Sequence, residues 1–340
     1  MDKKKQIAKI LLEWHTKNGR HNLPWVGQAD PSGYKTFLSE IMMQQTTVAV
    51  GEKRFPEFLK KFPTWEDLAA ATEDDVMKGW EGLGYYRRAR YLHASSKEIV
   101  KNHGGVLPAA RADRLALPGV GKSTASALGS FVFGFPEPIW DANVERVFRR
   151  LFGDEIPDKE GAIWAWQDKD HKEMIPKGKE RVWPQALMDF GSLLCLPRNP
   201  LCPACPLQSL CPYGQNPPSS QKDSPSTPKP VKQVVWKHWG VFVRDGYMAI
   251  HPPRQNGIWA GLWLFPEIPA HDLRNKKIIV SGSHDLSHRR ILWYIALFDQ
   301  KDDVPYGCEL VSFSDIQQRG FPKPLMDFLK SKDFKGLIEK

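Results

Sequence analysis

The stretch Leu117-Pro-Gly-Val-Gly-Lys-Ser-Thr-Ala125 decides the fold of the N-terminal part of this chain. Gly119 and Gly121 permit a tight turn, and a helical pattern begins directly after them. Amides at a helix start attract an anion, and the helix dipole adds to this attraction. A P-loop is excluded, because its first glycine would have to replace Ala116. A plain corner between helices is the alternative, but the basic, helical surroundings favour a hairpin that holds the DNA backbone.

Helical patterns continue on both sides of this stretch. They predict helices over 3–17, 34–59, 88–102, 123–133, 144–152 and 181–194. The chain has a formal net charge of +9, which indicates a polyanionic partner without identifying it. No apolar run approaches the roughly 18 residues of a membrane helix. No targeting signal is evident either, so we expect a cytoplasmic protein without membrane contact.

Asp141 directly precedes the apolar and basic helix predicted over 144–152. On structural grounds alone, an aspartate at this place is an ordinary N-cap. A carboxylate held by helix amides is also stabilised in its charged form, however. Asp141 is therefore a candidate for stabilising a cation.

Glu40 is the candidate acid that would accompany this anion. It lies among apolar residues in Leu38-Ser-Glu-Ile-Met-Met-Gln-Gln-Thr-Thr47, and burial in such surroundings raises the pKa of a carboxyl. A glutamate on a helix surface is the alternative. The dense polar patch of Gln44, Gln45 and Thr46 weakens it, because such residues suit hydrogen bonding to bases.

Aromatic and basic residues follow glycines in Gly82-Leu-Gly-Tyr-Tyr-Arg-Arg-Ala-Arg90. Aromatic rings beside arginines such as Arg88 suit stacking on bases and anchoring of phosphates. The alternative is a core aromatic pair beside a solvated charged face. We interpret the segment as a contact with nucleic acid.

Four of the five cysteines follow the pattern C-x6-C-x2-C-x5-C, at Cys195, Cys202, Cys205 and Cys211. Thiolates so close together need a cation to offset their repulsion, and a set of sulfur ligands suits zinc or an iron–sulfur cube. The single C-x2-C pair favours a [4Fe-4S] cluster over zinc. A disulfide framework is a poor alternative, since such frameworks belong mainly to small secreted domains.

The periodicity changes from helical to alternating near residue 215. Residues 216–232 are rich in Pro and Ser and predict a linker. Strands are predicted over 234–243, 247–251, 277–280 and 291–298. The sequence thus predicts an α-helical domain with the hairpin and the cysteine loop over 1–215, and an α+β domain over 233–340.

Together these motifs resemble the endonuclease III superfamily of base-excision DNA glycosylases, and within it the MutY-type adenine DNA glycosylases. The resemblance is carried in order by Leu23–Trp25, Leu38–Thr46, Gly82–Arg90, Leu117–Gly121, Asp141 and the cysteine cluster. It implies a helix-hairpin-helix fold, a [4Fe-4S] cluster and excision of adenine mispaired with 8-oxoguanine, with A:G as a further substrate.

The resemblance also implies roles for single residues. Glu40 would protonate adenine and then position water, and Asp141, next to Asn143, would stabilise the oxocarbenium-like sugar. Gln45 and Tyr85 would enter the duplex, with Thr46 and Leu83 beside the opposite base. Further contacts with DNA are expected at Gln44, Arg88, Gly119, Val120, Gly121, Lys122 and Arg198.

Ser123 stands where relatives that also cut the DNA backbone have a lysine that forms a Schiff base with the sugar. This difference predicts a monofunctional glycosylase, in which Lys122 points elsewhere on the helix. Residual lyase activity through Lys122 stays open. Ala142 replaces a glycine that is common in the family, and alanine narrows the allowed backbone beside Asp141.

The C-terminal part resembles the nudix-like domain with which MutY proteins read 8-oxoguanine, through Gly257–Pro266 and His284–His288. Ser287 and His288 are expected to contact the damaged base, with a hydrogen-bond network at a strand end as the alternative. Leu286 stands where the family usually has phenylalanine. The glutamate-rich box of nudix hydrolases is missing, so we expect neither pyrophosphatase activity nor catalytic magnesium.

Two other functions stay open. An endonuclease III-like glycosylase/lyase is disfavoured by Ser123 and by the second domain. A non-catalytic iron–sulfur lesion sensor is disfavoured by the pairing of Glu40 with Asp141, because a pure binder needs neither group. We expect a monomer that binds double-stranded DNA containing A:8-oxoG mispairs.

Overall fold

The computed structural model describes residues 2–27, 30–216, 232–274 and 276–338. They fall into two compact units, one of Met1–Ala69 with Ala94–Ser226 and one of Ala70–His93 with Thr227–Lys340. Most of the linker predicted over 216–232 lies outside the described residues. In the described part of the chain, no helix has the length and apolar character needed to cross a membrane.

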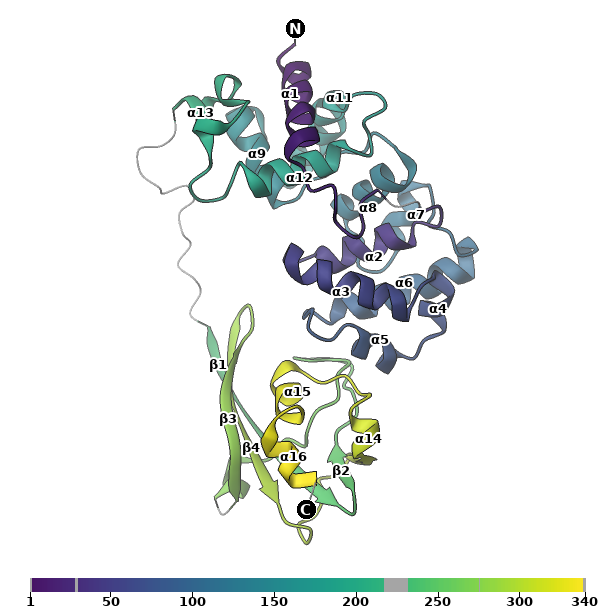
Figure 1. Cartoon of the computed structure of the whole chain (residues 1–340), viewed down its shortest axis with the longest axis vertical. Coiled ribbons are helices and arrows are strands. Elements are labelled where there is room, and N and C mark those ends of the chain that lie inside the picture. The colour runs from purple at the N-terminus through teal and green to yellow at the C-terminus, as the bar shows by residue number, and fades with distance from the viewer. Residues whose placement is uncertain (1, 28–29, 217–231, 275, 339–340) are drawn as a thin grey trace. The chain divides into compact units, whose positions relative to one another are not determined.

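The first unit is helical (Figure 1). Its α-helices are α1 (Lys3–Asn18), α2 (Tyr34–Met43), α3 (Val48–Lys61), α4 (Trp65–Ala70), α7 (Arg111–Ala116), α8 (Lys122–Leu128), α9 (Ala142–Phe152), α10 (Glu160–Trp166), α11 (Lys172–Met174), α12 (Trp183–Leu193) and α13 (Pro212–Gln215). The π-helices η1 (Gly129–Phe133) and η3 (Gln167–His171) continue α8 and α10. Helix α6 (Arg87–His103) runs from the second unit into the first.

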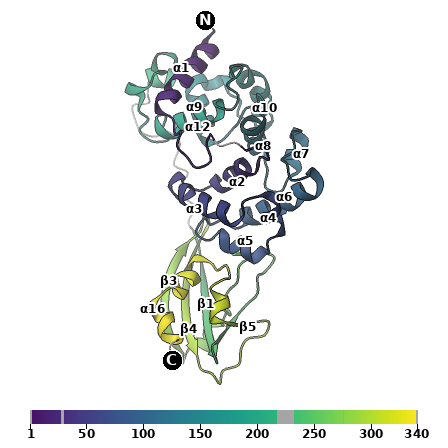
Figure 2. The same cartoon turned by 45° about the vertical axis from the view of Figure 1, so that its right-hand side comes forward.

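Helix α9 contributes to the apolar core of this unit and forms because its apolar residues recur at helical spacing. Val144, Val147, Phe148 and Leu151 are all buried on one face. Helix α12 packs against both α9 and α1 (Figure 2). Burial of each large apolar side chain contributes about 1.5–3 kcal/mol. The start of α9, which carries Asp141, is therefore held by a rigid core.

The single helix predicted over 34–59 is wrong. The structure has α2 and α3 there, separated by the polar segment 44–47, and Gln45 adopts a left-handed φ of 57°. A residue in that conformation cannot continue a right-handed helix. The polar patch thus forms a loop directly after the helix that carries Glu40, with Gln45 exposed and Gln44 and Thr46 half-buried.

The second unit contains a five-stranded sheet in the order β3-β4-β1-β2-β5. Its strands are β1 (Gln233–Arg244), β2 (Tyr247–Ile250), β3 (Lys277–Asp285), β4 (Arg289–Phe298) and β5 (Glu309–Ser312). Strand β1 runs parallel to β4, and the other neighbours are antiparallel. The helices of this unit are α5 (Glu73–Gly79), α14 (Phe313–Ile316), α15 (Lys323–Leu329) and α16 (Lys332–Ile338). The α+β class expected for this region is confirmed.

One face of the sheet is covered by C-terminal helices, which the sequence reading did not predict (Figure 1). Trp239 and Ile295 on the strands pack in one core with Leu325 and Phe328 of α15. The turn between β3 and β4 carries Ser287 and lies outside this core.

Residues 70–93 belong to the same unit as the sheet, although they precede it by a long stretch of sequence. The Asp74 carboxylate accepts a hydrogen bond of 2.9 Å from Trp263 Nε1 and pairs with Arg319. Glu81 pairs with Lys330 at 2.6 Å. These contacts bring the Gly82–Arg90 segment into the unit that also contains Ser287.

Candidate active site

Asp141 is the N-cap of α9. Its Oδ1 accepts hydrogen bonds from the backbone N–H groups of Asn143 at 2.9 Å and Val144 at 2.8 Å. These bonds satisfy amides that a helix start otherwise leaves without partners. Ala142 is the first residue of the helix and takes helical geometry, so alanine is compatible with the backbone there. The cap holds the carboxylate in one orientation.

Glu40 lies near the end of α2, among the buried residues Phe37, Leu38 and Ile41. Burial, with a smaller contribution from the negative charge of Asp141, raises the pKa of Glu40 from 4.5 to about 7. The sequence predicts this rise. At neutral pH a substantial share of Glu40 therefore carries a proton beside an anion, which is the pairing needed to cleave a glycosidic bond.

In the sequence, the predicted hairpin lies between the segment that carries Glu40 and the segment that carries Asp141. Gly119 has a φ of 79°, which favours glycine, and α8 begins at Lys122. Val120 is buried, and Ser95 Oγ donates a hydrogen bond of 3.0 Å to the carbonyl of Pro118, which fixes the loop.

Lys122 and Ser123 follow the hairpin loop but have different surroundings. The Lys122 ammonium lies 5.3 Å from the centre of the Trp164 ring. The Ser123 hydroxyl accepts a hydrogen bond of 3.0 Å from the backbone N–H of Trp140, the residue before Asp141. The serine therefore lies one residue from the candidate anion, while the neighbouring amine faces an indole.

The second unit holds the loop expected to contact the lesion. Tyr85 has a φ of 46°, and its hydroxyl lies 2.9 Å from Ser287 Oγ. Arg88 donates hydrogen bonds to the carbonyls of Leu83 and Gly84 and lies over the rings of Trp80 and Tyr85. Burial lowers the pKa of Arg88 to about 10, which still leaves it charged. Arg88 thus holds the loop in shape.

Leu83 is buried in this loop, whereas His288 and Arg198 are exposed. The backbone carbonyl of His288 accepts a hydrogen bond of 3.3 Å from the Gln233 N–H. This bond fixes the end of the β3–β4 turn through the backbone of an exposed residue. The structure therefore brings Tyr85 and Ser287 together, and places His288 beside them in sequence.

The four cysteines at 195–211 line one small cavity, together with apolar residues and Arg150. Arg150 Nη1 lies 3.2 Å from Cys195 Sγ. Burial, with a smaller contribution from the neighbouring sulfurs, raises the pKa of Cys205 to about 11. None of the five cysteines forms a disulfide. Among the described residues, no group of three or more His, Cys, Asp or Glu side chains already has the geometry to hold a metal ion.

Arg146 of α9 connects the cysteine loop with the candidate active site, and the sequence reading missed it. Its Nη2 donates to Asn143 Oδ1 at 2.9 Å and to the Gly191 carbonyl at 2.7 Å, and its Nε donates to the Cys195 carbonyl at 2.9 Å. The sequence feature that could have indicated Arg146 is its place near the start of the helix that Asp141 caps. Helix α9 thus carries both the anion and the cation that contacts the first cysteine.

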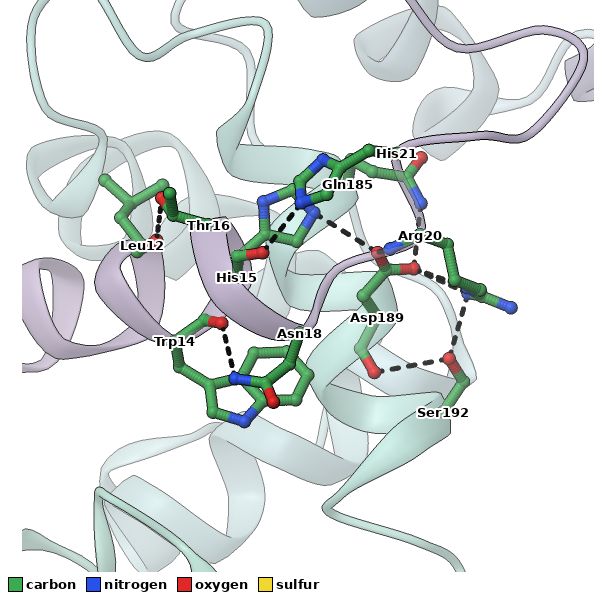
Figure 3. Close-up of polar contacts among 10 residues, drawn as sticks. All are labelled: Leu12, Trp14, His15, Thr16, Asn18, Arg20, His21, Gln185, Asp189 and Ser192. Atoms are coloured by element: carbon green, nitrogen blue, oxygen red, sulfur yellow. Dashed lines mark hydrogen bonds and ion pairs between the residues drawn. The ribbon is translucent and has the colours of Figure 1, made fainter.

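Asp189 of α12 anchors the chain that follows α1 (Figure 3). Its buried carboxylate accepts from the Arg20 backbone N–H and Nε, both at 2.8 Å, from Gln185 Nε2 at 2.9 Å, and contacts His15 Nε2 at 3.2 Å. Burial alone raises the pKa of Asp189, but the bonds from His15 and Arg20 outweigh it, so the pKa lies below its usual range. The network fixes α12, whose Gly191 packs directly on Asn143.

Comparison with known proteins places these features in a family. A model of the HhH-GPD superfamily of base excision DNA repair proteins matches residues 38–163, which contain Glu40, the hairpin and Asp141. An adenine DNA glycosylase of Buchnera aphidicola subsp. Baizongia pistaciae is 34% identical over 82% of this chain and 82% of its own length. The chain belongs to the adenine DNA glycosylase family. It is a DNA glycosylase of base excision repair.

Solved structures agree with this assignment. A thermostable thymine-DNA glycosylase is 29% identical, with a TM-score of 0.58 over 63% of this chain and 97% of its own. Endonuclease III in a non-covalent complex with DNA is 26% identical, with a TM-score of 0.53 over 63% of this chain and 98% of its own. The helix-hairpin-helix glycosylase fold expected from the sequence is confirmed.

Proposed function

We propose that this glycosylase removes adenine mispaired with 8-oxoguanine from double-stranded DNA, with A:G as a further substrate, and that it does so by hydrolysis alone. The observation that carries the proposal is the pairing of Glu40, whose pKa is about 7, with the capped carboxylate of Asp141. The match to an adenine DNA glycosylase over 82% of the chain supports adenine as the base.

In the proposed reaction, Glu40 donates its proton to the adenine ring. The bond between the sugar C1′ and adenine N9 breaks, and its electron pair leaves with the base. Asp141 stabilises the resulting oxocarbenium-like sugar by its negative charge, while Asn143 is held beside it. The Glu40 carboxylate then takes a proton from water, and the hydroxide attacks C1′ to give an abasic site.

The environment of residues 122–123 supports a monofunctional enzyme. A lyase needs an amine at the sugar, but residue 123 is a serine bonded to Trp140, and the Lys122 ammonium lies over Trp164. The endonuclease III-like alternative therefore lacks a placed nucleophile in the described structure. A protein that only senses lesions would not need a protonated Glu40 close to the Asp141 carboxylate.

We further propose that residues 1–215 form the catalytic domain, 216–232 the linker, and 233–340 a domain that reads 8-oxoguanine opposite adenine. Tyr85 and Ser287, which share a hydrogen bond in the second unit, support a lesion contact made jointly by the loop and the β3–β4 turn. Gln45 and Thr46, in the loop after α2, would fill the space left by the extruded base.

The chemistry of the cysteine loop supports a [4Fe-4S] cluster. All four cysteines line one cavity, where burial first and the neighbouring sulfurs second raise the pKa of Cys205, and a cationic cluster would stabilise the thiolates against both effects. Cys195, Cys202, Cys205 and Cys211 would hold it. The cluster would cross-link the loop that carries Arg198. The Arg198 side chain would then face a DNA phosphate.

Single-turnover cleavage of a duplex with one central A:8-oxoG pair tests the function. Strand breaks should require alkali, and should be lost in Glu40→Gln and Asp141→Asn. Glu145→Gln is the matched control, because Glu145 lies on the same helix as the Asp141 cap and pairs with Arg149. Breaks without alkali would establish a lyase, and tight binding without breaks would establish a sensor.

A further inference from the structure

The first turn of α8 contacts both segments that carry the catalytic carboxylates. The Ser123 hydroxyl accepts the backbone N–H of Trp140 at 3.0 Å, one residue before Asp141. The adjacent Thr124 hydroxyl accepts a hydrogen bond of 3.5 Å from Nε2 of Gln44, the C-cap of the helix that carries Glu40. Two neighbouring hydroxyls thus lie between the two sides of the active site.

The hydrogen bond of Ser123 constrains a different part of the chain from the hydrogen bonds of the Asp141 cap. The cap bonds involve Asn143 and Val144, which follow Asp141 and fix the carboxylate relative to α9. The bond to Trp140 fixes the chain just before Asp141 relative to α8 instead. Asp141 is therefore held from both sides, and one of them is the helix that directly follows the hairpin loop.

The hairpin loop is also the element proposed to hold the DNA backbone. Gly121 is the N-cap of α8, and Ser123 is the second residue of that helix. A phosphate bound at Gly119–Gly121 would therefore fix α8, and the two hydroxyls would pass that constraint to the segments before Asp141 and after Glu40.

We propose that Ser123 and Thr124 are positioning residues that set the separation between Asp141 and Glu40 and link it to the grip on the DNA backbone. This inference rests on the proposed function. Under this proposal Ser123 has a positioning role, in addition to being a residue that cannot form a Schiff base. A lysine at position 123 would have no hydroxyl to accept the hydrogen bond from the Trp140 N–H.

The test compares Ser123→Ala, Ser123→Thr and Thr124→Val with wild type. Misplacement of a catalytic group lowers the rate without weakening ground-state binding, so Ser123→Ala should lower the saturating single-turnover rate roughly 10- to 100-fold. Its Kd for the same duplex with a non-hydrolysable adenosine analogue should stay within about 2-fold of wild type. Thr124→Val should show a smaller loss, because its bond is longer.

Ser123→Thr is the rescue variant, since threonine keeps the hydroxyl, and should restore most of the rate. Ser126→Ala is the matched control: Ser126 lies on the same helix and accepts a hydrogen bond of 3.3 Å from Arg111, far in sequence from both carboxylates. Its rate should equal that of wild type. Thermal unfolding of every variant checks that each one folds.

A wild-type rate in Ser123→Ala would overturn the inference. So would equal losses in Ser123→Ala and Ser126→Ala, or no recovery in Ser123→Thr, because each would indicate general damage to α8. If wild type itself removes no adenine, the proposed function fails instead. The wild-type reaction in the same series therefore separates the two failures.

Discussion

At the scale of the residue, Glu40 and Asp141 show how one kind of functional group is placed in two different environments. Glu40 lies among apolar side chains that disfavour its charge, whereas Asp141 accepts two helix amides. Burial among apolar side chains raises the pKa of Glu40, while helix amides hold the Asp141 carboxylate in place. A proton donor and a carboxylate can therefore lie within electrostatic reach of each other at neutral pH.

The rate of excision should follow the protonation of Glu40. Because the pKa of Glu40 is about 7 and the acid form donates the proton, the single-turnover rate should be level at acidic pH and fall about tenfold per pH unit above neutrality. Asp141→Glu keeps the charge and should keep the midpoint. A rate that stays level to pH 9 would contradict Glu40 as the acid.

The same shift has a consequence for stability. Folding raises the pKa of Glu40 from 4.5 to about 7, so the folded state disfavours the ionised form, and stability is lost as the pH rises through this window. Glu40→Gln removes this penalty. Its midpoint of thermal unfolding should exceed that of wild type by several degrees at pH 8 and match it at pH 4. A lower midpoint at pH 8 would refute the raised pKa.

At the scale of the element, α9 joins the cysteine loop to the active site. Arg146 contacts Asn143 and the Cys195 carbonyl from this one helix. Arg146→Ala should therefore lower the single-turnover rate by roughly 10-fold or more, because Asn143 loses its partner. Arg149→Ala is the control, since Arg149 pairs with Glu145 and Asp158. Equal rates in the two variants would show that Arg146 has no role in positioning.

Helix α12 depends on the charge of Asp189. Asp189→Asn keeps the shape but removes the charge that His15 and Arg20 share, so it should lower the free energy of unfolding by about 3 kcal/mol at pH 7. The pKa of Asp189 is depressed, so wild type should lose this contribution only as the pH falls below about 4. Urea unfolding at pH 7 measures it. Glu13→Gln, at an exposed pair, should change nothing.

The sequence predicts α9 and α12 well because their apolar spacing is regular and their ends carry ordinary signals. It does not predict the break at Gln45, because nothing in a run of glutamines and threonines signals a left-handed residue. It also misses α15, although Pro324 near its start is a helix signal. Arg146 was not recognised since its partners lie in other elements, and only the folded chain brings them together.

At the scale of the whole molecule, the net charge of +9 should make DNA binding strongly dependent on salt. Each phosphate contact adds about 0.9 to the slope of log K against log salt concentration. Arg198→Ala should lower that slope by about one while leaving the single-turnover rate at saturation unchanged, because the exposed Arg198 belongs to the cysteine loop. Fluorescence anisotropy over a salt series measures it. An unchanged slope would remove Arg198 from the DNA contact.

The grouping of residues 70–93 with the C-terminal sheet could not be predicted from sequence patterns. Asp74 and Trp263 are 189 residues apart in sequence, and no local pattern pairs them. The parallel pairing of β1 with β4 is hidden for the same reason. Local patterns predicted the strands β1 to β4 and the helix α9, whereas the partners of each segment depend on packing across the fold.

Gln45 and Tyr85 both hold a left-handed backbone that glycine would adopt without penalty. Relieving such a conformation commonly stabilises a protein by about 1 kcal/mol. A laboratory selection for heat resistance alone should therefore recover glycine at both positions. The selected variants would be more stable to heat but would repair mispairs less well. Thermal stability and repair activity would therefore be in conflict at positions 45 and 85.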